Sequence, residues 1–88
     1  MKVKELLYLL KLDYVEETDD IYTCNLNYKK GNVLSKFLTE FADNKLERDD
    51  YSVVFYTLGN FEMALAFNPL DEGDNSYKLT VTEKSKLL

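Results

Sequence analysis

The sequence of 88 residues contains no histidine or tryptophan, and it has one cysteine, one proline and three glycines. Without histidine, the chain lacks the commonest general base near neutral pH and a common metal ligand. A single cysteine cannot form an internal disulfide, and a structural zinc site needs about four cysteine or histidine ligands. The glycines are scattered and open no phosphate-binding loop. We therefore predict that the protein is not an enzyme and holds no metal or cofactor.

Long hydrophobic runs and a basic excess are also missing. No apolar run reaches the length of a membrane span, and the first residues show no secretory cleavage site. Acidic residues outnumber basic ones by 16 to 11, which gives a net charge of −5, whereas nucleic-acid-binding domains usually carry a basic stripe. We expect no membrane contact and no direct nucleic-acid contact. The lone Cys24 further predicts a reducing, cytoplasmic location.

Residues 51–67 form an apolar stretch around which the fold is organised, because they contain one charge, Glu62. Gly59 and Asn60 divide the stretch into two β-rich runs, and a glycine accepts the positive φ of a tight hairpin turn. We predict a hairpin with Leu58 opposite Phe61. Directly opposed residues share a face, so the core face comprises Val54, Tyr56, Leu58, Phe61, Met63, Leu65 and Phe67. The reverse face comprises Tyr51, Val53, Phe55, Thr57, Glu62, Ala64, Ala66 and Asn68.

The remaining elements follow from the spacing of apolar residues. Helical spacing predicts helices over residues 3–12 and 33–46, the second with Asn32 as its N-cap. Alternation predicts strands over residues 21–28 and 76–82, and a short strand begins near Tyr14. The order α-β-β-α-β-β-β predicts a single α+β domain over residues 1–88. Two helices would pack on one face of an antiparallel sheet of four to five strands.

That packing leaves the reverse face of the hairpin uncovered. Tyr51, Val53 and Phe55 on this face are candidates for self-association, because contiguous apolar groups are unusual on a surface that meets only water. Cover from within the chain, or a mildly apolar exposed face, is the alternative.

Acidic residues are clustered along the chain. On the predicted helix 33–46, Glu40, Asp43 and Glu47 would form one stripe. A stripe of carboxylates can occupy sites on a basic protein surface that phosphates otherwise fill. The candidate partner-binding acids are Glu40, Asp43, Glu47, Asp49, Asp50, Asp19 and Asp20. A solvated helix face flanked by acidic loops is the alternative.

The short length, the acidity, the composition rich in Lys, Asn, Tyr and Asp, and the opening KVKELL helix resemble small acidic phage-encoded inhibitor proteins of the anti-CRISPR type. The resemblance includes no diagnostic motif and assigns no role to any residue. It implies a non-enzymatic module that blocks a basic, nucleic-acid-binding surface of a host protein, such as a CRISPR effector, in the host cytoplasm. A homo-oligomeric structural or assembly domain that uses the outer hairpin face is the alternative, and a carboxylate–metal enzyme is a third hypothesis.

Overall fold

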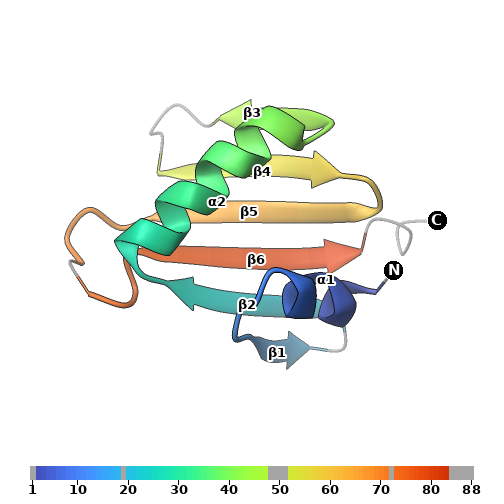
Figure 1. Ribbon diagram of the computed structural model, residues 1–88, viewed down its shortest axis with the longest axis horizontal. Coiled ribbons are helices and arrows are strands. Elements are labelled where there is room, and N and C mark those ends of the chain that lie inside the picture. The colour runs from blue at the N-terminus through green and yellow to red at the C-terminus, as the bar shows by residue number, and fades with distance from the viewer. Residues whose placement is uncertain (1, 19, 48–51, 72, 84–88) are drawn as a thin grey trace.

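The computed structural model describes residues 2–18, 20–47, 52–71 and 73–83. The elements in chain order are α1 (Val3–Leu9), β1 (Val15–Thr18), β2 (Ile21–Leu26), α2 (Tyr28–Phe41), β3 (Asn44–Glu47), β4 (Val53–Leu58), β5 (Phe61–Phe67) and β6 (Tyr77–Glu83). The strands form one antiparallel sheet in the order β1-β2-β6-β5-β4-β3 (Figure 1). The predicted α+β class is confirmed. The predicted count of four to five strands is wrong, because β3 adds a strand and the sheet has six.

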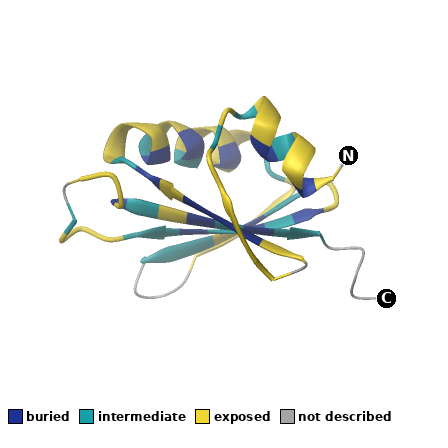
Figure 2. Ribbon diagram, turned by 90° about the horizontal axis from the view of Figure 1, so that it is seen from below, coloured by how far each residue is buried: buried dark blue, intermediate teal, exposed yellow. Residues whose placement is uncertain are grey.

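Both helices lie on the same face of the sheet, and the opposite face has no second layer in the described part of the chain (Figures 1 and 2). α1 packs on β6, and α2 crosses β2, β6 and β4. The Thr39 and Tyr56 hydroxyl oxygens lie 3.2 Å apart, which ties α2 to β4. The core between the layers comprises Val3, Leu7, Tyr22, Cys24, Leu26, Leu34, Leu38, Tyr56, Phe61, Met63, Leu65, Leu79 and Val81. Among the described residues, neither helix is long and apolar enough to cross a membrane.

The central hairpin has the predicted register. Leu58 pairs with Phe61 and Val54 with Leu65. Gly59 has a φ of 58°, a value that most side chains disfavour and glycine accepts. The turn therefore fixes which residues of β4 and β5 face the helices and which face away.

The start of α2 differs from the prediction. The Asn27 side chain accepts a hydrogen bond from the Lys30 backbone N–H at 2.8 Å, so Asn27 rather than Asn32 is the N-cap. The helix begins at Tyr28, and Gly31 lies inside it instead of in a turn before it. The strand expected over residues 21–28 correspondingly ends at Leu26.

The end of α2 also differs. The helix stops at Phe41, because Ala42 is extended, with a ψ of 147°. The Asp43 backbone N–H then donates to the Thr57 carbonyl oxygen at 2.7 Å. This bond brings the chain alongside β4. There it forms β3, in which Leu46 pairs with Phe55 of β4.

α1 ends at Leu9, earlier than the predicted boundary at residue 12, in a two-bond C-terminal cap. The backbone N–H groups of Lys11 and Leu12 donate to the carbonyl oxygens of Tyr8 and Leu7, both at 3.0 Å. Lys11 occupies the left-handed position of this cap, with a φ of 57°. Residues that continued the helical pattern in the sequence therefore form the connection to β1.

Candidate interaction surface

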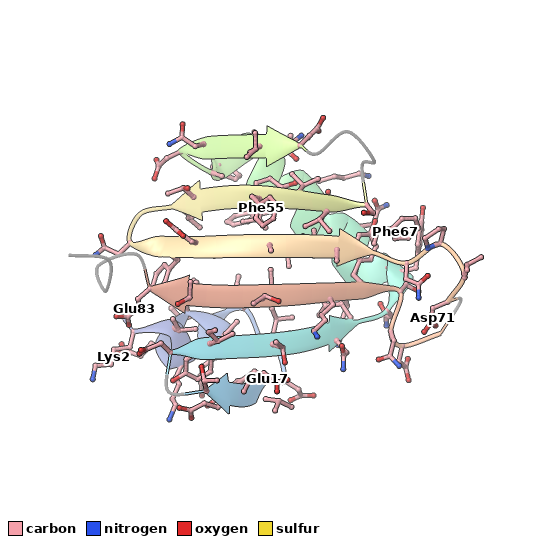
Figure 3. All side chains as sticks on the ribbon, turned by 180° about the vertical axis from the view of Figure 1, so that it is seen from behind. Lys2, Glu17, Phe55, Phe67, Asp71 and Glu83 are labelled. Atoms are coloured by element: carbon pink, nitrogen blue, oxygen red, sulfur yellow. The ribbon has the colours of Figure 1, made fainter. Side chains whose placement is uncertain are left out.

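The open face of the sheet has an uncharged central row that crosses all six strands. Directly paired residues point to the same side, and successive pairs place Val15, Thr23, Thr80, Ala64, Phe55 and Leu46 side by side. Figure 3 views this face and shows the Phe55 ring lying over it. The apolar side chains of the row are substantially exposed, since Phe55, Val15 and Leu46 retain 39%, 58% and 66% of their accessible surface.

Two further rows flank the central one. One contains Ile21, Thr82, Glu62, Thr57 and Asn44, and the other contains Asn25, Lys78, Ala66 and Val53. Most side chains of these two flanking rows are small or β-branched. Glu62 and Lys78 are the two charged residues in the three rows. Glu17 reaches the rim, where its carboxylate accepts a hydrogen bond from the Thr23 hydroxyl at 2.9 Å.

The residues predicted for self-association fall partly on this face. Val53 and Phe55 lie on it, as the hairpin register predicted, whereas Tyr51 lies outside the described residues. Sequence reasoning missed the contributions of Val15, Ile21 and Leu46, which depend on the order of the strands. The alternation of residues 76–82 was a usable signal, because it already placed Lys78, Thr80 and Thr82 opposite the core.

The predicted acidic stripe does not form on a helix. Only Glu40 lies in α2, while Asp43 follows the helix and Glu47 ends β3. The Asp43 carboxylate accepts a hydrogen bond from the Gly59 N–H at 2.8 Å. Glu47 lies 2.9 Å from the Lys45 ammonium, and this hydrogen bond raises the pKa of Lys45. The prediction failed because helical spacing was extended past the actual end of α2.

Of the other predicted partner-binding acids, the structure describes one. Asp20 is exposed beside β2, whereas Asp19, Asp49 and Asp50 lie outside the described residues. The part of the chain that the structure describes contains no group of three or more acidic or cysteine side chains placed to hold a metal ion. A partner-binding role for these acids stays a prediction.

Cys24 belongs to the core and not to a reactive site. The residue is 1% exposed. Burial, together with a smaller contribution from the charge of Asp13, raises the pKa of the thiol to about 11. The thiolate that a nucleophile or metal ligand requires is therefore disfavoured near neutral pH.

No protein-family model matches the sequence. Neither a curated protein nor a solved structure is significantly similar to it. Among the described residues, the three rows of the open sheet face combine little charge with exposed apolar side chains.

Proposed function

We propose that the protein is a non-enzymatic protein-binding module whose open sheet face packs against the same face of a second copy. The observation that supports this proposal is the difference in charge between this face and the whole chain. The chain has a net charge of −5, yet three rows of residues across the sheet contain one acid and one base, Glu62 and Lys78. Exposed apolar side chains such as Phe55, Val15 and Leu46, set among small polar residues on a face with little charge, are typical of a protein interface.

The two charges suit a twofold dimer. Glu62 on β5 and Lys78 on β6 each lie one row from the central pair Ala64–Thr80, on opposite sides of it. A twofold axis in the plane between two facing sheets can exchange these positions, so that Glu62 of each copy meets Lys78 of the other. With a rise of about 3.3 Å per residue and strands about 4.8 Å apart, this exchange makes the two sets of strands cross at about 40°. Aligned sheets pack at roughly 30°.

The area of the face is sufficient for a dimer. Six strands spaced about 4.8 Å apart, with rows that span about 20 Å along the strands, give roughly 600 Å² per copy. Two copies would bury roughly 1,200 Å², the lower limit of standard stable interfaces.

The edges of the sheet favour packing through the face over strand addition. The edge strands β1 and β3 have four residues each. β1 carries Glu16 and Glu17, and β3 carries Lys45 and Glu47. Short, charged edges discourage a further strand from pairing.

A charge exchange tests the proposed geometry by sedimentation equilibrium. Glu62→Lys and Lys78→Glu should each weaken the dimer, because each places like charges opposite one another. The double variant should restore it, since the pairs are re-formed with reversed polarity. Glu40→Lys and Lys36→Glu make the same charge changes on α2 and should leave the dimer unchanged. A monomeric wild type, or a double variant weaker than both single variants, would contradict the proposal.

Phe55→Asp tests the apolar contribution in the same measurement. A carboxylate in the central row would be buried without a partner, so the variant should sediment as a monomer. Phe41→Asp is the matched control, because Phe41 is an exposed aromatic residue of α2 on the other side of the molecule. Equal effects of the two substitutions would show that the open face is not the interface.

Inhibition of a basic host protein by an acidic surface is a separate prediction. Its test uses Glu40→Lys with Asp20→Lys and spares Asp43, which bonds to the hairpin turn. Capture of the basic partner should be lost in the double variant and weakened by salt. Capture that persists in the double variant at high salt would contradict this prediction.

A further inference from the structure

An open groove lies on the helix-bearing side of the molecule, away from the open sheet face. Its volume is about 620 Å³. One wall is the segment after α1, and the other is the first half of α2, and both lie on the helix-bearing side of the sheet in Figure 1. The lining residues are Leu10, Lys11, Leu12, Asn27, Lys29, Lys30, Val33, Leu34 and Phe37.

The lining combines an apolar surface with positive charge only. Lys11, Lys29 and Lys30 contribute three ammonium groups, and none of the described acidic residues lines the groove. The ion pairs of the described residues are Lys4–Glu16 and Lys45–Glu47, so the groove lysines are in none of them. In a protein with a net charge of −5, this is a local reversal of sign. The groove therefore complements a ligand that is both anionic and apolar.

Charge and apolar surface are separated along α2. Lys29 and Lys30 lie in the first turn, where the helix dipole adds partial positive charge. Val33 and Phe37 follow at intervals of about one turn, and they are 63% and 39% exposed. A bound ligand would place its anionic group near the start of the helix and its apolar part along the following turns.

The opposite wall contains a backbone feature of its own. Lys11 adopts a φ of 57° in the cap of α1, a conformation that glycine adopts with less strain. The cap thus holds a lysine where the backbone favours a smaller residue. This lysine completes the cationic part of the groove.

We propose that the groove binds a linear alkyl carboxylate, with the carboxylate beside Lys29 and Lys30 and the alkyl chain along Val33 and Phe37. The volume is typical of small-molecule pockets and small for a protein partner. From Lys29 to Phe37 the helix rises about 12 Å, a length that suits the extended alkyl chain of dodecanoate. A neutral alkyl chain would gain the apolar contact without the attraction of the lysines.

Calorimetric titration with dodecanoate below its micelle-forming concentration tests the proposal, and dodecanol serves as the neutral probe. Wild-type protein should bind dodecanoate saturably and at least about tenfold more tightly than dodecanol. Lys29→Glu with Lys30→Glu should weaken dodecanoate binding about tenfold or more and leave dodecanol binding unchanged. The matched control is Lys36→Glu, which changes the charge of the same helix outside the groove.

A second variant separates the apolar wall from the charges. Val33→Glu should weaken both probes, and amide shifts in an NMR titration should concentrate on residues 10–12 and 27–37. Circular dichroism of each variant verifies the fold. The proposal is overturned if wild-type protein gives no saturable binding of dodecanoate, if both probes bind equally, or if Lys36→Glu loses as much affinity as the double variant.

Discussion

The ring of Tyr77 lies directly against Gly31, where β6 passes beneath the start of α2. A methyl group on Gly31 would overlap Cγ and Cδ2 of this ring. The same ring packs against Tyr28 and Phe67, with centroid separations of 6.2 and 4.9 Å. The missing side chain at Gly31 therefore allows α2 to approach the sheet closely enough to close an aromatic cluster.

Gly31→Ala should destabilise the protein, although alanine is the better helix former by about 1 kcal/mol. The overlap with Tyr77 should outweigh that gain and leave a net loss of about 1–3 kcal/mol, which urea unfolding measures. Gly73→Ala is the matched control, because the nearest atom to its added methyl group would be the Asp71 carboxylate oxygen at 3.5 Å. A Gly31→Ala variant as stable as wild type would mean that moving the Tyr77 ring aside costs no more than alanine's gain in helix propensity.

Lys11→Gly should stabilise the fold. Relief of the left-handed conformation at the cap of α1 should add about 1 kcal/mol to the free energy of unfolding. The same change removes a groove ammonium, so dodecanoate should bind more weakly to the more stable protein. Lys29→Gly, in a helical conformation, should instead cost up to about 1 kcal/mol. A loss of stability in Lys11→Gly would show that the Lys11 side chain makes contacts that stabilise the fold.

Asp43→Ala should loosen the link between the end of α2 and the β4–β5 hairpin. The variant loses the hydrogen bond from the Gly59 N–H to the carboxylate, at a cost of about 1 kcal/mol for an exposed site. Asp43→Asn keeps an acceptor oxygen and should recover most of that loss in chemical denaturation. Glu40→Ala should change stability by less than about 0.5 kcal/mol. Comparable losses at Glu40 and Asp43 would assign the effect to overall charge.

The hairpin was predictable because its determinants are local. Gly59 and Asn60 fix the turn, and a period of two then assigns every side chain of β4 and β5 to a face. The placement of Val53 and Phe55 on the uncovered face followed from the same argument. An error of one residue in the turn would have reversed both faces, so the apolar core pattern and the turn supported each other.

The boundaries of α2 were not predictable in the same way, because they depend on contacts distant in sequence. From its sequence context, Gly31 is expected to interrupt a helix. In the structure it lies within α2, because the Tyr77 ring occupies the space that a side chain would need. Leu46 continues the helical spacing, yet it joins β3 because β4 offers an unpaired edge. The sequence therefore predicted only part of the open face, since Val15 and Leu46 lie on it through strand pairings that no local pattern specifies.

The raised pKa of the Cys24 thiol makes the free energy of unfolding depend on pH in the alkaline range. Burial, with Asp13 adding to it, raises the pKa of the thiol from 9.0 to about 11 in the folded protein. Below pH 9 both states keep the proton, so this contribution is complete. Between pH 9 and about pH 11 the thiol of the unfolded chain loses its proton first. The free energy of unfolding therefore falls as the pH rises, by at most about 2–3 kcal/mol.

Urea unfolding of wild-type protein and Cys24→Ala at about pH 8 and about pH 10.5, with a reductant present, measures this dependence. Burial also raises the pKa values of Tyr22 and Tyr77, but these groups are present in both proteins and cancel in the comparison. The alanine variant should be less stable at the lower pH, because it removes a buried sulfur, and the gap should narrow at the higher pH. A gap that stays constant would show that the Cys24 thiol titrates equally in the folded and unfolded states.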